Sequence, residues 1–85
     1  MKRPLDQPIN VTCYSGYKGD EAPRSFIYEN KSHEICEIIE RWCEKPLSGI
    51  GLRRFFKVKA DDGMFYTIYY DEDLNIWFLS LNASS

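Results

Sequence analysis

The segment from Arg53 to Leu79, RRFFKVKADDGMFYTIYYDEDLNIWFL, contains three short runs of aromatic and β-branched residues separated by turn signals. The first run alternates between two sets of side chains, and such alternation places successive residues on opposite faces of a strand. Asp62-Gly63 is a strong hairpin signal because both residues accept the positive φ of a primed turn. The segment DEDLN supplies a second turn. The sequence therefore predicts three consecutive antiparallel strands, at 53–60, 64–70 and 76–81.

A two-residue turn at Asp62-Gly63 also predicts the register of the first two strands. Each residue of the first strand then lies opposite the residue of the second strand that is equally far from the turn. On one face the predicted pairs are Lys59 with Tyr66, Lys57 with Ile68 and Phe55 with Tyr70. On the other face they are Val58 with Thr67 and Phe56 with Tyr69. The expected core residues are Phe56, Tyr69, Trp77 and Leu79.

The first third of the chain shows two further strand patterns. Residues 9–14 alternate apolar and polar side chains, and residues 24–29 resume strand character after a loop rich in glycine. Pro4 and Pro8 interrupt the residues before the first pattern. We therefore expect a flexible N-terminal arm at 1–8, a single β-domain at 9–81 and a disordered tail at 82–85.

Residues 33–43 permit two interpretations. Ile35, Ile38, Ile39 and Trp42 have helical spacing, which predicts a helix of about ten residues. The turn-prone pair Asn30-Lys31 instead suits a hairpin. A long strand with a bulge at Ile38-Ile39 would direct Cys36, Ile38 and Trp42 inward.

Together these segments predict an all-β fold. It is a small antiparallel meander of five or six strands, curled into an open barrel or a strongly bent sheet, with one short helix near 33–43 as an alternative. At 85 residues the core is thin, so large aromatic side chains are needed to fill it.

Composition narrows the possible locations and partners. A net charge of −2 argues against binding of duplex DNA or membranes through overall charge. The sequence predicts no secretory signal and no membrane span, and its three cysteines form no CxxC motif. We predict a cytoplasmic protein with free thiols, no cofactor and no contact with membranes.

The aromatic and basic residues of the C-terminal strands are the candidate binding surface. Aromatic rings can stack on bases while cations hold phosphates, as in proteins that bind single strands. The same residues could instead contact a partner protein. The predicted binding residues are Arg53, Arg54, Phe55, Lys57, Lys59, Tyr66 and Tyr70.

Catalytic and metal-binding patterns are sparse. His33 with Cys13, Cys36 and Cys43 would suit a structural zinc site by number, but the spacing lacks paired knuckles. Asp71, Glu72 and Asp73 could supply paired carboxylates, although acidic residues are common in exposed turns. No nucleophile and base stand in a recognisable pattern. We predict a binding module that is not an enzyme and has no catalytic or metal-binding residues. The alternative is a small metal-dependent or enzymatic domain using His33 and the cysteines or Asp71–Asp73.

The order of these motifs resembles a known family. The matching positions are Pro8-Ile9, Phe26, Tyr28, Ile35, Ile38, Arg41-Trp42, Arg54, Phe56, Val58, Gly63, Tyr66, Tyr70, Trp77 and Leu79. They resemble a family of small uncharacterised bacterial all-β proteins, some encoded beside translesion-type DNA polymerases. The resemblance implies a strand rather than a helix at 32–44 and a partner connected with nucleic-acid metabolism. It implies no catalytic residue, and the segment CEKPLSG is less basic than its counterpart in the family.

Overall fold

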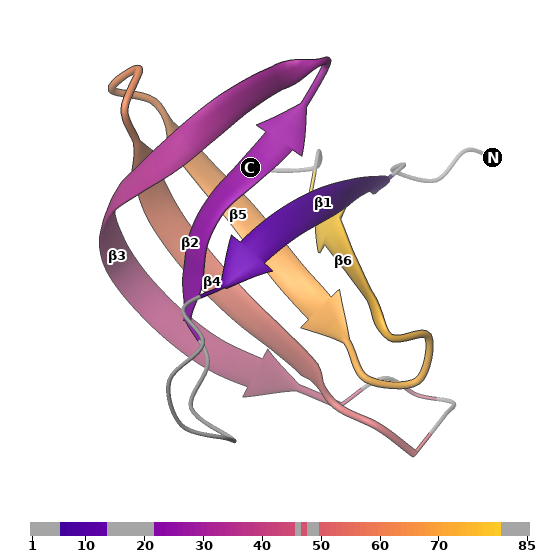
Figure 1. Cartoon of the computed structure of the whole chain (residues 1–85). Coiled ribbons are helices and arrows are strands. Elements are labelled where there is room, and N and C mark those ends of the chain that lie inside the picture. Colours follow the sequence, from indigo (N-terminus) through magenta and orange to yellow (C-terminus); the bar gives the residue numbers. More distant parts are fainter. Residues whose placement is uncertain (1–5, 14–21, 46, 48–49, 81–85) are drawn as a thin grey trace, which may run out of the picture.

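The computed structural model describes residues 6–13, 22–45, 47 and 50–80, and these form a closed six-stranded barrel (Figure 1). The strands are β1 (Gln7–Cys13), β2 (Pro23–Tyr28), β3 (Lys31–Glu44), β4 (Arg53–Ala60), β5 (Phe65–Asp71) and β6 (Ile76–Leu79). Each strand pairs antiparallel with the next, and β6 pairs with β1. The predicted all-β meander is confirmed, and its two end strands meet.

The limits of the predicted domain can be compared with the strands. β1 begins at Gln7, two residues before the predicted start of the domain. The remainder of the predicted arm, at 1–5, and the predicted tail at 82–85 lie outside the described residues. Among the residues that the structure describes, no helix is long and apolar enough to cross a membrane.

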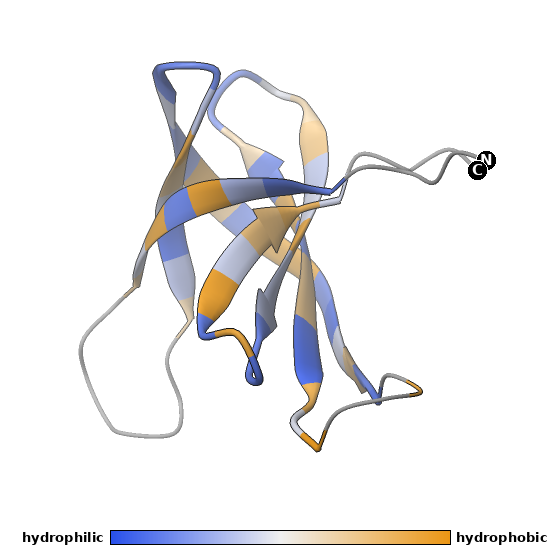
Figure 2. Cartoon of the chain, turned by 90° about the vertical axis from the view of Figure 1, so that its right-hand side faces the viewer, coloured by the Kyte–Doolittle hydropathy of each residue, from blue (hydrophilic) through white to orange (hydrophobic). Residues whose placement is uncertain are grey.

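The core lies inside the barrel and receives alternate residues from the strands. Its buried cluster consists of Phe26, Phe56, Val58, Ile68 and Leu79. Val58 and Ile68 are 0% exposed. Figure 2 shows apolar and polar residues interspersed along the strands. Burial of one face of each strand, rather than β-propensity alone, is what holds a domain of this size together.

The hairpin between β4 and β5 has a three-residue turn. The N–H of Ala60 donates to the carbonyl oxygen of Met64 at 2.9 Å, and Gly63 has a φ of 83°. This is the turn in which a glycine in the left-handed region follows a tight bend. Lys59 therefore lies opposite Phe65, and Phe55 lies opposite Tyr69.

The predicted register of this hairpin was consequently wrong by one residue. A shift of one residue moves every side chain of the partner strand to the other face. Tyr66 and Ile68 share the inner face with Val58 and Phe56, whereas Phe65 and Tyr69 share the outer face with Phe55. Of the predicted core residues, Phe56 and Leu79 belong to the buried cluster, and half-buried Trp77 packs against it.

β3 confirms the strand interpretation of residues 33–43. Its pairing with β4 is irregular at two places, between Ile35 and Glu37 and between Ile38 and Glu40. Each irregularity inserts one extra residue, Cys36 or Ile39, and both of these are exposed. A bulge of this kind leaves one residue without a partner and restores the inward direction three positions later. Ile38 packs on the core as predicted, but the inward placement of Cys36 and Trp42 was wrong.

Candidate binding site

A row of aromatic rings crosses the outside of the barrel from β3 to β6. Trp42 lies opposite Phe55, Phe55 opposite Tyr69, and Tyr69 opposite Phe78. The rings of each pair are stacked, with centroid distances of 5.3, 4.6 and 5.3 Å along the row. Cross-strand aromatic pairs of this geometry stabilise a sheet beyond the area that they bury. We call these four residues the outer aromatic row.

Tyr69 connects the outer aromatic row to Asp6, which directly precedes β1. Its hydroxyl donates to a carboxylate oxygen of Asp6 at 2.5 Å, and Arg53 lies 5.7 Å from the ring centroid. The residue is 5% exposed, although it points away from the core. Burial, followed by the hydrogen bond to Asp6, raises the pKa of Tyr69 far above its usual value. Tyr69 was predicted to lie in the core. It is buried as predicted, but on the outer face of the sheet.

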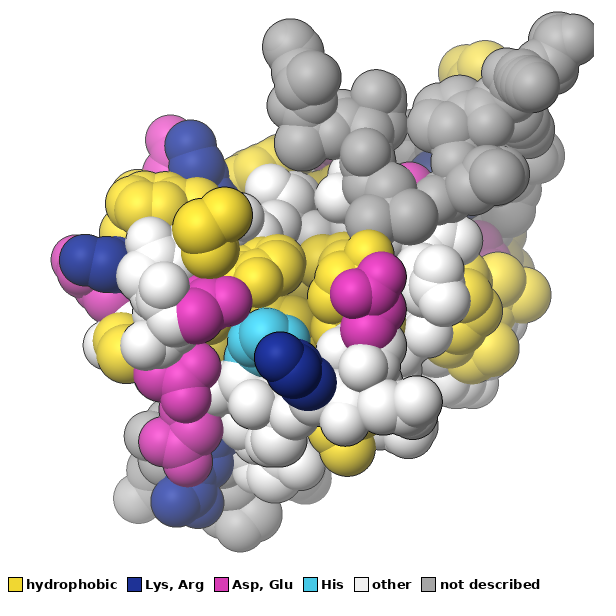
Figure 3. Space-filling view, turned by 90° about the horizontal axis from the view of Figure 1, so that it is seen from above, with side chains coloured by type: hydrophobic (Ala, Val, Ile, Leu, Met, Phe, Trp, Pro, Cys, Tyr) yellow, Lys and Arg dark blue, Asp and Glu magenta, His cyan; other side chains and the backbone are white. Residues whose placement is uncertain are grey.

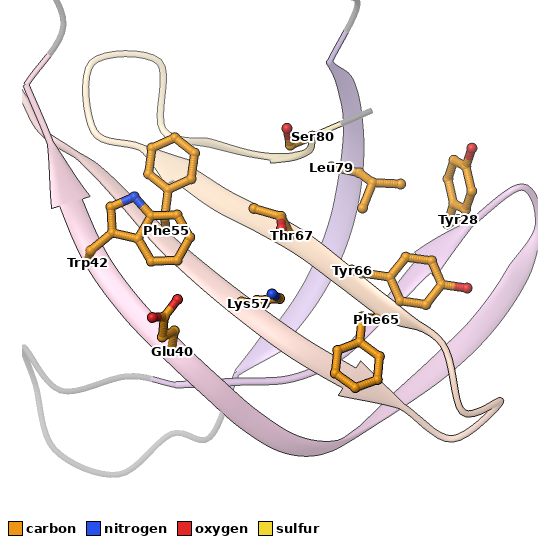
Figure 4. Close-up of a pocket in the computed structure, with 10 residues that line it drawn as sticks. All are labelled: Tyr28, Glu40, Trp42, Phe55, Lys57, Phe65, Tyr66, Thr67, Leu79 and Ser80. Atoms are coloured by element: carbon orange, nitrogen blue, oxygen red, sulfur yellow. The ribbon is translucent and has the colours of Figure 1, made fainter. Parts of the chain in front are cut away.

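Beside the outer aromatic row lies an open groove of about 570 Å³ (Figure 4). Trp42 and Phe55 stand together at one end, and Phe65 and Tyr66 stand at the other, with Lys57 and Thr67 between them. Five of its ten lining residues are aromatic. The lining residues are Tyr28, Glu40, Trp42, Phe55, Lys57, Phe65, Tyr66, Thr67, Leu79 and Ser80. We call this feature the outer groove.

The charges of the outer groove balance. Glu40 of β3 lies opposite Lys57 of β4, and among the described residues these are the two charged side chains that line it. Lys57 is exposed, and among the described residues it forms no ion pair. Aromatic side chains that remain exposed, such as Phe65 at 55%, are available to a partner. The groove can therefore take a largely apolar ligand with few charges.

The structure separates the seven predicted binding residues. Phe55, Lys57 and Tyr66 line the outer groove, although the ring of Tyr66 also packs on Phe26 in the core. Lys59 lies on the same outer face, but it is half-buried and does not line the groove. Tyr70 lies beside Trp77 at 5.3 Å, and its hydroxyl donates to Asn75 at 2.7 Å. The predicted single face holding Phe55, Tyr66 and Tyr70 does not exist, because the register differs by one residue.

Arg53 and Arg54 pair with acidic side chains at the end of β5 and in the turn that follows it. Nε of Arg53 donates to Asp71 at 3.3 Å, and Nε of Arg54 donates to Glu72 at 2.7 Å. The hydrogen bond to Glu72 raises the pKa of Arg54, and the pKa of Glu72 is lowered by the N–H of Leu52 and by Arg54. These two arginines therefore contribute less free positive charge than the sequence suggested.

The acidic turn itself is a structural clamp. Asp71 accepts the N–H groups of Asp73 and Leu74 at 2.9 and 3.1 Å. Asp73 and Glu72 accept the N–H groups of Gly51 and Leu52 at 2.9 and 3.0 Å. These carboxylates thus tie the loop before β4 to the turn before β6, as acidic side chains in turns commonly do. The geometry gives no paired catalytic carboxylates there.

His33 and the cysteines do not come together in the described part of the chain. Cys36 and Cys43 are exposed free thiols on β3, and Cys13 lies half-buried on β1. The residues near His33 are instead Asp61 and Asp62, from the turn between β4 and β5. The zinc arrangement of His33 with cysteines is therefore not formed by the described residues.

Sequence reasoning missed several residues of the outer groove. Glu40, Trp42, Phe65 and Thr67 reach it because β3, β4 and β5 lie side by side in the observed register. The sequence does indicate that Trp42 is exposed, because a strand that carries four glutamates around a tryptophan is unusual for a buried position. No comparable signal existed for Thr67.

Comparisons of the chain with protein-family models, with curated proteins and with solved structures found no match.

Proposed function

We propose that this protein is a non-catalytic binding module that holds an extended segment of a partner protein in the outer groove. The observation that carries this proposal is the groove itself, which has aromatic rings at both ends, most of them on the paired strands β3, β4 and β5. Sites built on strands hold their side chains more firmly than sites on loops. Exposed aromatic rings bury much area with little loss of side-chain freedom, which is why they are enriched in protein interfaces.

The charges favour a protein over single-stranded nucleic acid. Arg53 and Arg54 are engaged by Asp71 and Glu72, and Glu40 lies across from Lys57. A phosphate backbone in the groove would meet one lysine and one carboxylate. Proteins that bind single-stranded nucleic acid need an excess of cations along the phosphate backbone. The family resemblance connects such a partner with nucleic-acid metabolism, and this connection stays a prediction.

The absence of a reaction is also part of the proposal. The carboxylates of Asp71, Glu72 and Asp73 are used in the clamp described above. The exposed thiols of Cys36 and Cys43 support a reducing, cytoplasmic compartment.

Selection from a library of random peptides displayed on phage would test the proposal. The selected peptides are synthesised, and their affinity is measured by the change in tryptophan fluorescence, because Trp42 lines the groove. Phe65→Ala removes a groove wall that is mostly exposed and should weaken binding at least ~10-fold, as expected for an aromatic contact residue. Met64→Ala is the matched control, since Met64 is equally exposed but does not line the groove.

Two results would overturn the proposal. One is a set of selected peptides that bind Phe65→Ala as tightly as the unchanged protein. The other is a labelled oligothymidine that binds at low salt, loses affinity as salt rises, and depends on Lys57 and Phe55. The second result would identify single-stranded nucleic acid as the ligand.

A further inference from the structure

We propose a binding site for a divalent transition-metal ion, of the zinc type, formed by His33, Asp61 and Asp62 at the end of the barrel away from the acidic clamp. One ligand atom from each residue lies within 4.8 Å of the others. The three residues come from the start of β3 and from the turn between β4 and β5. None of these three residues lines the outer groove, so the site goes beyond the proposed function.

His33 supplies the nitrogen ligand of the proposed site. Its side chain is 11% exposed, and its ring makes no hydrogen bond to another described residue. Its Nδ1 faces an oxygen of Asp62 at 3.6 Å, which is too long for a hydrogen bond. Two ligand atoms held at about 2.1 Å by one tetrahedral ion lie about 3.4 Å apart. The spacing between His33 and Asp62 is therefore close to that of two ligands sharing an ion.

The surroundings hold each ligand in place. The ring of His33 stacks on Phe26 at 5.1 Å and lies 5.4 Å from Tyr66. The carboxylate of Asp62 accepts the N–H of Met64 at 2.9 Å and the hydroxyl of Tyr66 at 2.8 Å. Hydrogen bonds of this kind orient ligating carboxylates in metal sites.

The turn is also tied to the strand that carries the histidine. The N–H of Asp61 donates to the carbonyl oxygen of Glu34 at 2.8 Å, next to His33 in the chain. The side chains of Asp61 and Asp62 are exposed, so an ion can reach them from solvent. Figure 3, which looks down on this end of the barrel, shows the single histidine of the chain at the surface, with a basic side chain against it and acidic side chains nearby.

The donor set suits a first-row transition metal. A neutral imidazole nitrogen and two carboxylate oxygens satisfy zinc, with a remaining position for water. Two carboxylates also offset the charge of a divalent ion. Calcium and magnesium are less suited, because both prefer sites made of oxygen alone.

Titration of the metal-free protein with zinc chloride, followed by calorimetry, tests the site. Exposed thiols also bind zinc, so the titration uses a variant in which Cys13→Ala, Cys36→Ser and Cys43→Ser remove them. We expect one ion per chain. Asp61→Asn should weaken binding at least ~10-fold without disturbing the fold, because that side chain makes no hydrogen bond within the described residues. Glu44→Gln, at the far end of β3, removes the same charge and should leave the affinity unchanged.

Nitrogen NMR of the His33 ring provides the second measurement. Zinc at Nδ1 moves the resonance of that nitrogen and leaves Nε2 protonated, whereas simple protonation changes both nitrogens. The proposal is overturned if no ion binds stoichiometrically, if Asp61→Asn binds zinc as tightly as its parent, or if the Nδ1 resonance does not respond. None of these outcomes depends on the outer groove, so the two proposals can fail separately.

Discussion

Tyr66 shows how one residue serves both the core and the surface. Its ring packs against Phe26 at 5.2 Å in the barrel, while its hydroxyl donates to Asp62 at 2.8 Å. Burial and the neighbouring carboxylate of Asp62 both disfavour the phenolate. They raise the pKa of Tyr66 to about 12, from an ordinary value of 10.0.

The raised pKa predicts how stability changes at high pH. Because the native state holds the phenol proton more tightly than the unfolded state, the contribution is complete below pH 10 and is lost as the pH rises through about 12. Tyr66→Phe removes a hydrogen bond worth about 1 kcal/mol at neutral pH. Urea unfolding should show that the unchanged protein loses its advantage over Tyr66→Phe between these two pH values. An advantage that stays constant across this range would contradict the assignment.

At the scale of elements, the outer aromatic row joins four strands on the side away from the core. Trp42 and Phe55 stack with an interplanar angle of 9°, and Phe55 continues the row to Tyr69. The row stabilises the sheet where β3 extends beyond β2. Two of its rings, Trp42 and Phe55, also line one end of the outer groove, where the proposed partner would bind.

A double-mutant cycle measures the coupling within this row. Trp42→Ala and Phe55→Ala should each destabilise the protein, and the double variant should lose less than the sum of the two. The expected coupling energy is about 0.5–1.5 kcal/mol, as found for stacked aromatic pairs. Urea unfolding of the four proteins gives the value. A sum that is strictly additive would mean that the two rings do not interact in solution.

The clamp between the loop before β4 and the turn before β6 leaves no space at Gly51. A Cβ added there would lie 2.8 Å from Cβ of Glu72 and 3.1 Å from the backbone nitrogen of Asp73. Gly51→Ala should therefore destabilise the protein by about 1–3 kcal/mol through steric overlap. Ile50→Ala, at a neighbouring residue that is 87% exposed, should change stability by less than about 0.5 kcal/mol. Equal thermal melting of the two variants would show that the clamp opens in solution.

At the scale of the whole molecule, a small core limits stability. A domain of 85 residues has about 4–13 kcal/mol of unfolding free energy. Ile68 is fully buried at the centre of the cluster, whereas Ile39 is 40% exposed at a bulge. Ile68→Ala should cost about 2–5 kcal/mol, which is a large share of the total. Ile39→Ala should cost far less, and chemical denaturation that ranks the two in the opposite order would contradict the barrel interior described here.

Much of this fold could be predicted from the sequence, but less of the candidate site. Alternation along 53–60 and the turn signals at Gly63 and DEDLN located the strands, because these features act within a few residues. The site depends on which strand faces are shared, and this changes with a single residue of register. Asp61 fits equally well as the last residue of a strand or as the first of a turn, so the sequence allowed both registers.

The helical spacing of apolar residues in β3 also results from how the strands pair. Ile35 and Ile38 are three residues apart because Cys36 is an extra residue in a bulge, and Ile39 is the extra residue of the next one. Bulges turn a period of two into a local period of three, which imitates one face of a helix. Only pairing with β4 distinguishes the two cases, since a bulge is defined by the partner strand.

The sequence by itself determined that the chain forms short antiparallel strands in this order, because alternation and turn chemistry are local properties. Tertiary structure decided the three-residue turn at Asp61–Gly63, the two bulges in β3 and the closure of β6 on β1. These choices depend on burying Val58, Ile68 and Leu79 together, and on contacts between residues as distant as Ile9 and Trp77. The outer groove and the cluster around His33 follow from those contacts, because each combines residues that are far apart in the chain.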